Sequence, residues 1–466
     1  MRRAPLGAAL AALAALLAPA AAEGAVSIDP ERITVTSDAG GVEIEREPFA
    51  LRLLDPDGEV VLRSVRRGRR AGGTLYAPLV AVRGSEPELV EPFLPAQPNP
   101  NPRDPPRPRR DVAGRVSGIE RVGEGVRLQV GALVVTVAPD APGTFAVQAR
   151  GVDGVAAVAA AFRSSRREAF HGFGGYREST NARGRRIHTA VSGYNYPDPE
   201  PAYYYVQPQF VSSRYAVLLD QDERASWRMA SDRRDAWRVT APGRLRLILA
   251  PGEPVATMAA LSAITGRHAL PPEWSMGPIL WRATRPQQTT PESYEAAIRA
   301  DLDRIEREGL AVSGYAFEGW AILRREALTE IVERLRARGI RPILYIRSFV
   351  SNDGAATDPP GVFDFAVERG YVARRADGSP YFYGSTFLAA RSAVIDFTNP
   401  EALAWWQGRV REMLDLGAEG FMSDFGEDVL GDMVFADGST GRTMRNRYPV
   451  LQHRAAREVV DAFRAE

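Results

Sequence analysis

The strongest constraint on the fold is a regular alternation of strands and helices in the second half of the chain. Apolar strands are predicted over residues 278–281, 311–316, 342–346 and 420–423, with a minor extra strand over 393–396. Amphipathic helices are predicted over 291–308, 325–338, 401–416 and 448–465. Buried-type strands that alternate with helices predict a parallel sheet, either a barrel or a doubly wound sheet. No glycine-rich phosphate loop follows the first strand, which disfavours a dinucleotide-binding domain.

The first half of the chain has a different pattern of predicted secondary structure. Short alternating strands separated by Gly, Asp and Pro turns predict a β-sandwich over residues 25–252. Residues 91–110 hold eight prolines and are predicted to form an exposed loop. A helix is expected over about 254–265, within a helical connector over 253–272, and the strand–helix region occupies 273–466.

The N-terminus predicts export. Met1-Arg2-Arg3 is followed by an Ala/Leu run and by small residues up to Gly24. A basic start, a short apolar run and a small-residue cleavage site are typical of a secretory signal peptide, here residues 1–24. The run is short for a membrane span, so a periplasmic or extracellular protein without a stable membrane span is expected.

Composition narrows the chemistry. The chain has 59 basic and 58 acidic residues, so no basic excess points to nucleic acid. All basic residues are arginines, cysteine is absent and only four histidines occur. Lysine Schiff bases and cysteine nucleophiles are therefore excluded, and a Cys/His metal site is disfavoured. Carboxylates, tyrosine, serine and the few histidines remain as reacting groups, and a mechanism that uses carboxylates and water needs no cofactor.

One carboxylate stands out at the end of the strand predicted over 420–423. The segment Met422-Ser423-Asp424-Phe425-Gly426-Glu427-Asp428 places Asp424 at the carboxyl end of this strand, where reacting groups lie in barrels of alternating strands and helices. Glycosyl transfer normally uses two acids. Glu427 and Asp428 lie on the same short turn as Asp424, which disfavours either of them as the second acid.

These motifs resemble those of a known family. The matching segments run from Phe170-His171-Gly172-Phe173-Gly174-Gly175 through Gly266-Arg267-His268-Ala269-Leu270-Pro271-Pro272 and Asp396-Phe397-Thr398-Asn399-Pro400 to Met422–Glu427 and Arg445-Asn446-Arg447-Tyr448-Pro449. In this order they resemble glycoside hydrolase family 31, the retaining α-glycosidases, and within it the sulfoquinovosidase-like and α-glucosidase branch.

The resemblance implies an N-terminal β-sandwich packed on a (β/α)8 TIM barrel, of which about the first four βα units are present. It implies that Asp424 is the nucleophile and that the acid/base is a second Asp downstream, so the sequence is interpreted as truncated. Two departures disfavour a sulfosugar substrate. Arg445 replaces the usual His before Asn446. The segment Phe317-Glu318-Gly319-Trp320 leads almost directly into a helix, without the Trp-rich part of the segment that binds the sulfonate in sulfoquinovosidases.

Further strand ends supply candidate contacts to an α-glycoside. Trp281 and Arg282 end the first strand, Glu318 and Trp320 follow the second, and Arg347 follows the third. Trp281 is interpreted either as a stacking platform or as barrel filling, and Arg347 either as a sugar contact or as a structural ion pair. Glu427 is expected to accept a sugar hydroxyl, with helix capping as the alternative. Asn446 completes the predicted substrate contacts.

Two other functions fit the same residues. A non-catalytic carbohydrate-binding or scaffold protein would keep the half barrel without turnover. An eliminase acting on the same linkage would share the nucleophile and differ only in its product. The sequence favours a retaining α-glycoside hydrolase and leaves the sugar, the linkage and the oligomeric state open.

Overall fold

The computed structural model describes residues 25–466 apart from 67, 87–88, 90–107, 176–178, 192–204, 285–289, 353–357 and 384–390. The predicted signal peptide and most of the predicted proline-rich loop lie outside the described residues. Arg109 and Arg110, assigned to that loop, belong instead to strand β9 (Arg109–Val112), because their backbones pair with Arg83 and Val82 of β8 (Leu79–Arg83). Among the described residues, no helix is long and apolar enough to cross a membrane.

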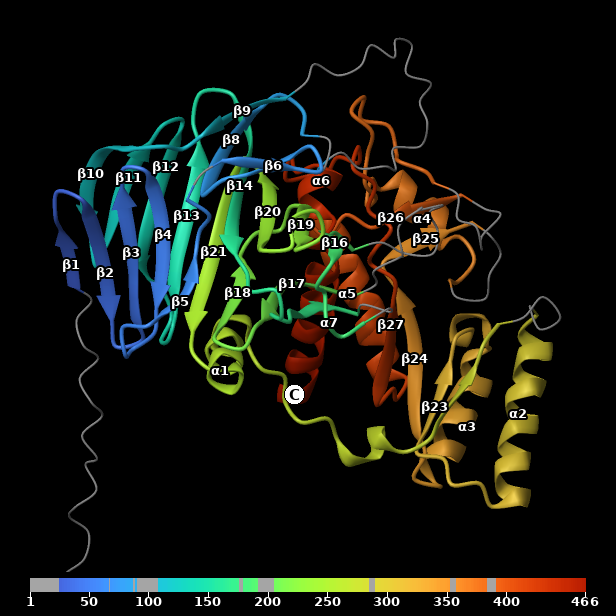
Figure 1. Ribbon diagram of the computed structural model, residues 1–466. Coiled ribbons are helices and arrows are strands. Elements are labelled where there is room, and N and C mark those ends of the chain that lie inside the picture. Colours follow the sequence, from blue (N-terminus) through green and yellow to red (C-terminus); the bar gives the residue numbers. More distant parts are fainter. Residues whose placement is uncertain are drawn as a thin grey trace, which may run out of the picture.

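The described part of the N-terminal region consists of antiparallel sheets. One has the order β1-β2-β3-β4-β5, a second β10-β11-β12-β13-β21-β18-β17-β15 and a third β16-β19-β20-β14-β8-β9 (Figure 1). The strands of the first sheet are β1 (Ala25–Ile28), β2 (Arg32–Ser37), β3 (Gly40–Arg46), β4 (Phe49–Leu54) and β5 (Val60–Arg63). Those of the second are β10 (Val116–Val122), β11 (Gly125–Val130), β12 (Leu133–Pro139), β13 (Phe145–Gly151), β15 (His171–Gly174), β17 (Val206–Val211), β18 (Tyr215–Leu219) and β21 (Arg244–Pro251). The third adds β14 (Val155–Arg163), β16 (Arg185–Thr189), β19 (Ala225–Met229) and β20 (Ala236–Pro242) to β8 and β9, and β6 (Arg69–Ala71) pairs with β7 (Thr74–Tyr76).

Alternating apolar residues hold these sheets together. In β12, Leu133, Val135 and Val137 are fully buried, whereas the residues between them are half-buried. Side chains of successive strand residues point to opposite faces, so this pattern turns one face of each sheet to a shared core. That core contains residues from all three sheets, which is consistent with the predicted β-sandwich.

Helix α1 (Pro254–Thr265) joins the two regions and has the predicted bounds. Pro254 opens the helix, and Gly266, with φ 84°, follows its end. Residues 266–272 then continue without helix to a 3-10 turn, Glu273–Met276, so the predicted connector over 253–272 is helical only in its first part.

The C-terminal region is built on a parallel sheet. In the described residues its order is β22-β23-β24-β27, with strands β22 (Ile279–Arg282), β23 (Gly314–Phe317), β24 (Arg341–Arg347) and β27 (Gly420–Asp424). The helices are α2 (Pro291–Glu308), α3 (Arg325–Arg336), α4 (Val362–Glu368), α5 (Pro400–Asp415), α6 (Gly441–Met444) and α7 (Tyr448–Ala465). Within the part described, this sheet does not close into a barrel. The extra strand expected over 393–396 is β26 (Ser392–Val394), which pairs antiparallel with β25 (Phe349–Ser351) outside the parallel sheet.

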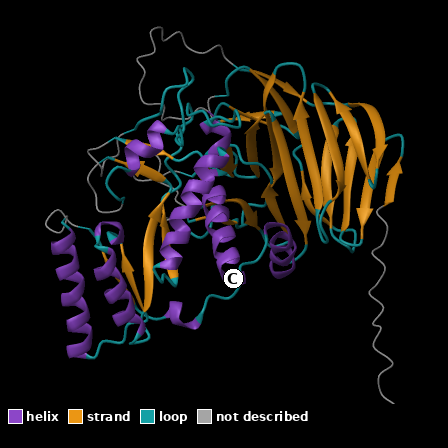
Figure 2. Cartoon of the chain, turned by 180° about the vertical axis from the view of Figure 1, so that it is seen from behind, coloured by secondary structure: helices purple, strands orange, loops and turns teal. Residues whose placement is uncertain are grey.

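The helices cover the sheet through their apolar faces. In α2 the buried residues Tyr294, Ile298, Leu302 and Ile305 recur every three or four positions, and a capping box between Thr290 and Ser293 begins the helix. Helices α5 and α7 run side by side between the parallel sheet and the sheet-rich region (Figure 2).

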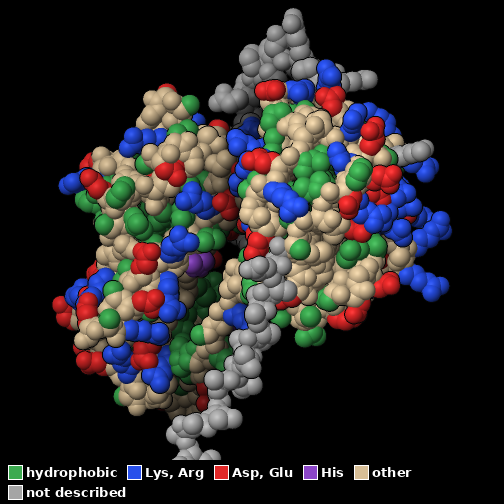
Figure 3. Space-filling view, turned by 90° about the vertical axis from the view of Figure 1, so that its left-hand side faces the viewer, with side chains coloured by type: hydrophobic (Ala, Val, Ile, Leu, Met, Phe, Trp, Pro, Cys, Tyr) green, Lys and Arg blue, Asp and Glu red, His purple; other side chains and the backbone are tan. Residues whose placement is uncertain are grey.

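The two regions form separate lobes. Figure 3 shows a furrow between them in which hydrophobic side chains are visible. One contact across the joint is made by Asn446, whose side chain accepts a hydrogen bond from Val191 N at 2.8 Å and donates to the carbonyls of Thr189 and Asp222 at 2.9 and 2.8 Å.

Candidate active site

Asp424 is the last residue of β27 and lies beside Arg347 of β24. The parallel register pairs these two residues directly, so both side chains emerge at the carboxyl edge of the sheet. Tyr345 Oη, two residues before Arg347, donates to Asp424 Oδ2 at 2.8 Å, and the backbone N–H of Phe425 donates to Oδ1 at 3.0 Å. The carboxylate is therefore held by one hydrogen bond on each oxygen while remaining partly exposed.

The turn after Asp424 is conformationally unusual. Phe425 has φ 64°, a left-handed conformation that non-glycine residues seldom adopt. Gly426 follows with φ 122°, and a Cβ atom there would lie 2.8 Å from Oε1 of Gln452. Gln452 itself donates to the hydroxyl of Ser423 at 3.0 Å and to the carbonyl of Asp424 at 3.3 Å. The chain thus turns sharply at the end of β27. In other proteins, strained backbone conformations of this kind cluster at functional sites.

Tyr345 is a fixed hydrogen-bond donor in this arrangement. Burial raises the pKa of its hydroxyl, and the neighbouring charge of Asp424 raises it further. Tyr345 therefore stays protonated at any working pH and remains a hydrogen-bond donor to the carboxylate of Asp424.

Further carboxylates surround Asp424. Glu318 follows β23 and accepts a hydrogen bond from the backbone N–H of Thr284 at 2.9 Å; burial raises its pKa, and the charge of Asp424 adds to this. Glu427 is 8% exposed, and burial followed by the charges of Asp428 and Asp424 raises its pKa to about 7. Asp428 is 2% exposed and accepts a hydrogen bond from Tyr383 Oη at 3.2 Å. Raised pKa values such as those of Glu318 and Glu427 are characteristic of functional sites.

Arg347 is held by a buried ion pair. Its Nη2 lies 2.6 Å from Oδ2 of Asp358, and Arg409 of α5 approaches the other oxygen at 2.8 Å. Burial disfavours ionisation of Asp358, but the charges of Arg347 and Arg409 outweigh it and lower the pKa of this carboxyl. The guanidinium of Arg347 also lies 4.4 Å from the centre of the Phe349 ring. This geometry supports a structural ion pair; a contact from Arg347 to sugar stays a prediction.

The other residues predicted to contact the substrate lie in different parts of the structure. Trp281 is 55% exposed on the edge strand β22. Arg282 donates from Nε to Asp301 of α2 at 2.8 Å, so it faces a covering helix. Trp320 is buried, and its indole N–H donates to the carbonyl of Tyr345 at 2.7 Å. Asn446 uses its amide at the joint between the regions. Substrate contacts by these four residues remain predictions, whereas Glu318, Arg347 and Glu427 lie around Asp424.

Five residues of the site were not predicted from the sequence: Tyr345, Asp358, Tyr383, Arg409 and Gln452. Tyr345 carried a usable signal, since it lies two residues before Arg347 in a strand and thus on the same face. Asp358 and Arg409 carried none, because their pairing depends on how a loop and a helix pack together. In the part of the chain that the structure describes, no cluster of three metal-ligating side chains occurs.

The raised pKa of Glu427 predicts a pH-dependent effect on stability. The pKa of about 7 lies well above that of an exposed glutamate, so folding disfavours the ionised form. The resulting loss of folding stability is absent below the ordinary pKa of a glutamate and grows as the pH rises. It is complete above pH 7, where it amounts to on the order of 3 kcal/mol. Glu427→Gln should therefore raise the melting temperature clearly at pH 8 and little at pH 4.5. Thermal unfolding of both proteins, beside the exposed control Glu326→Gln, checks this; an equal gain at both pH values would contradict it.

Comparisons with known proteins relate the C-terminal region to one family of glycoside hydrolases. Residues 268–466 match the model of the glycosyl hydrolases family 31 TIM-barrel domain. The chain is 26% identical over 269 residues to the alpha-xylosidase XylQ of Lactiplantibacillus pentosus, an alignment that covers 54% of this chain and 34% of that protein. It is 30% identical over 172 residues to the sulfoquinovosidase of Agrobacterium fabrum, covering 33% of this chain and 25% of that protein. The chain thus spans about a third or less of the length of the curated relatives it matches.

A solved structure shares the fold. The family 31 sulfoquinovosidase of E. rectale superposes with a TM-score of 0.65 at 17% identity, over 94% of this chain and 64% of that one. The superposition extends over both regions, the sheet-rich half included. On the family-model match and these relatives, residues 268–466 are similar to the TIM-barrel domain of glycosyl hydrolase family 31.

Proposed function

We propose that this protein is a retaining α-glycoside hydrolase in which Asp424 attacks the anomeric carbon. The observation that carries the proposal is the placement of Asp424: a partly exposed carboxylate at the carboxyl end of β27, with Tyr345 and the Phe425 N–H donating to its two oxygens. Both hydrogen bonds hold the carboxylate in place at the strand end, as a positioned nucleophile requires.

The reaction proceeds in two steps. Asp424 forms a bond to the anomeric carbon as the bond to the leaving oxygen breaks, which gives a covalent glycosyl-enzyme and the free aglycone. Water then attacks the same carbon, the ester bond to Asp424 breaks, and the sugar is released with its original configuration. The chemistry uses carboxylates and water.

The proposal does not assign the acid/base role to Glu427 or Asp428. A raised pKa of about 7 would suit a general acid at neutral pH, and Glu427 has one. Its side chain is buried, as is that of Asp428, and both follow Asp424 within four residues. Buried groups on one side of the nucleophile cannot reach the leaving oxygen on the opposite face of the sugar. We propose that this proton comes from another carboxylate, and we expect Glu427 to support the loop.

The covalent intermediate is the direct test. A 2-deoxy-2-fluoro or 5-fluoro glycosyl fluoride carries a leaving group that needs no proton and slows the second step, so the intermediate accumulates. Incubating the complete gene product with such α-xylosyl, α-glucosyl and α-sulfoquinovosyl reagents should add one sugar mass, and peptide mapping should locate it on Asp424. These sugars are chosen because relatives are named for xylosides, glucosides and sulfoquinovosides.

Two outcomes would contradict the proposal. An adduct on another carboxylate would remove Asp424 from the nucleophilic role. Binding of the reagents with neither adduct nor turnover would instead favour a non-catalytic carbohydrate-binding protein.

A further inference from the structure

A groove lined by arginines crosses the N-terminal lobe, away from the carboxylate site. Three clefts of about 620, 490 and 570 Å³ adjoin one another: the first shares Arg63 and Arg163 with the second, and Arg52 and Arg66 with the third. We call their combined surface the arginine groove. The arginines that line it are Arg32, Arg46, Arg52, Arg63, Arg66, Arg69, Arg115, Arg163, Arg214 and Arg233.

The central cleft carries excess positive charge. Among the described residues, six arginines and one carboxylate, Glu45, line it. Glu45 is shared by Arg52 and Arg66, and Asp235 is shared by Arg163 and Arg233. Even when Glu43, the second partner of Arg52, is included, three positive charges are left over. The whole chain has a net charge of only +1, so this excess is local.

Two arginines in the centre are available to a ligand. Arg63 ends β5 and Arg69 begins β6, both are exposed, and neither forms an ion pair with another described residue. In the sequence, positions 63–70 hold five arginines and no acidic residue. Exposed guanidinium groups that lack a carboxylate partner repel one another, and each can bind a carboxylate or sulfate through two parallel hydrogen bonds.

A buried arginine supports the same interpretation. The side chain of Arg233 is 11% exposed and donates from Nε to Asp235 at 2.7 Å. Its buried Nη1 has no hydrogen-bond partner among the described residues. A buried donor left unsatisfied is unfavourable, and this one belongs to an arginine that lines the central cleft.

The shape and lining of the arginine groove select the kind of anion. Three connected clefts suit an extended chain with repeated negative groups better than a single ion. Single-stranded nucleic acids are normally bound by stacking on aromatic rings. Of the described residues that line the three clefts, Tyr215 alone is aromatic, and its ring lies in the buried core.

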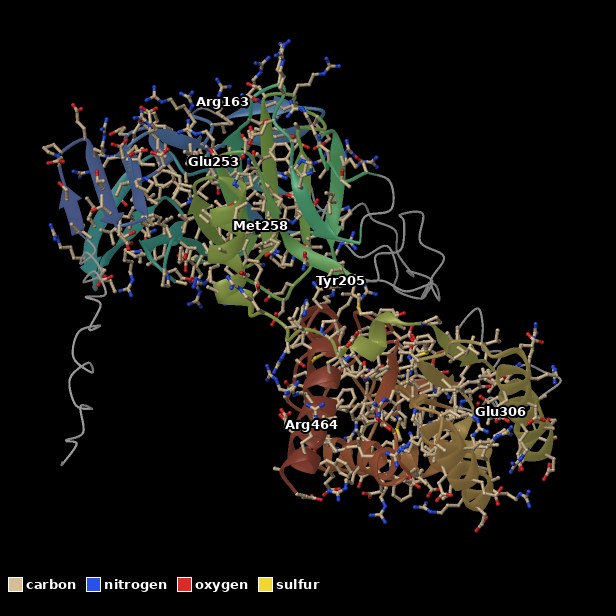
Figure 4. All side chains as sticks on the ribbon, turned by 90° about the horizontal axis from the view of Figure 1, so that it is seen from below. Arg163, Tyr205, Glu253, Met258, Glu306 and Arg464 are labelled. Carbon is tan, nitrogen blue, oxygen red and sulfur yellow. The ribbon has the colours of Figure 1, made fainter. Side chains whose placement is uncertain are left out.

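We propose that the arginine groove binds an extended acidic polysaccharide, one that carries sulfate or carboxylate groups. Arg163 lies on the side of the N-terminal lobe turned away from Glu306 and Arg464 of the C-terminal region (Figure 4). Binding there would hold the protein on an anionic glycan without occupying the site around Asp424. The inference stands on the geometry and charge of the groove, independently of the proposed reaction.

Binding of the complete protein to heparin and to polygalacturonate provides the test, with dextran as the neutral glycan. Titration calorimetry should show binding to both anionic glycans, none to dextran, and weakening as salt is added. The double substitution Arg63→Glu and Arg69→Glu should lower the affinity by about tenfold or more, because two guanidinium–anion contacts become repulsive.

A matched double variant separates a local site from overall charge. Arg304→Glu and Arg307→Glu on α2 change the net charge equally at side chains that are 66% and 67% exposed. This variant should keep its affinity for both glycans. Equal losses in the two variants, or no binding at physiological ionic strength, would overturn the proposal. Tighter binding of a single-stranded oligonucleotide than of either glycan would overturn it as well. Melting temperatures establish that the variants are folded, and Arg63→Gln with Arg69→Gln replaces the first variant if it is not.

Discussion

Replacing Asp424 with alanine should lower the turnover of an aryl α-glycoside by roughly four orders of magnitude or more, the scale on which loss of a nucleophile acts in other enzymes. The side chain is the one partly exposed carboxylate among the described acids around the end of β27 that has a hydrogen bond on each oxygen. Alanine removes the attacking oxygen and leaves Tyr345 in place. Steady-state kinetics on the complete gene product, with the sugar identified by the trapping experiment, measure the loss.

Chemical rescue distinguishes a nucleophile from a structural carboxylate. Azide can occupy the space left by the Asp424 side chain and attack the anomeric carbon, which would yield the β-glycosyl azide and restore part of the rate. A purely structural role predicts no such product. Asp437→Ala, which removes a partly exposed carboxylate from a turn of the same region, serves as control and should keep near wild-type turnover. Wild-type turnover by Asp424→Ala would refute the nucleophilic role.

Replacing Asp358 with alanine should lower the free energy of unfolding by about 3–5 kcal/mol, because removal of one partner leaves buried charge uncompensated. Asp358 is 8% exposed and binds both Arg347 and Arg409, whose side chains are 4% and 12% exposed. Denaturant unfolding followed by tryptophan fluorescence suits this test, since the indole of Trp406 donates to the carbonyl of Arg347 at 3.1 Å.

The ion pairs of Asp358 also predict that the free energy of unfolding depends on pH. The folded pKa of Asp358 is lowered, so its contribution is complete above the ordinary pKa of about 4 and is lost as the pH falls through the folded value. The difference between wild type and Asp358→Ala should therefore shrink below pH 4. The exposed i,i+4 pair of Arg457 and Asp461 provides the control, because Asp461→Ala should leave the stability nearly unchanged. Similar effects of the two substitutions would contradict the assignment of a buried network.

Helix positions were predicted well because their signals are local. Helices α1, α2 and α7 have the predicted bounds, and each carries a proline at its start. Strand ends were less accurate: β23 was predicted over 311–316 and spans Gly314–Phe317. The pairing partner decides where a strand ends, and that partner is distant in sequence. Asp424 extends β27 beyond the predicted end at residue 423 for this reason, since it pairs with Arg347.

The side-chain partners of the site were less predictable than the position of Asp424. Arg347 was proposed either as a sugar contact or as a structural ion pair, and its pairing with Asp358 and Arg409 supports the second. Asn446 was grouped with the substrate contacts through its motif, yet its amide joins the two lobes. The partners of Arg347 and of Asn446 cannot be predicted from residue spacing along the chain, because they depend on how segments far apart in sequence pack together.

The sequence by itself determined the order of the elements, the lack of lysine and cysteine chemistry, and a carboxylate at the end of a parallel strand. Strand and helix periodicity, helix-starting prolines and composition act locally, so they can be read along the chain. Only the tertiary structure decided which groups contact Asp424, which arginines are neutralised, and which arginines of the groove form no ion pair with another described residue. Hydrogen bonds, burial and charge balance depend on distances in space, and those distances are set when the two lobes and their layers pack.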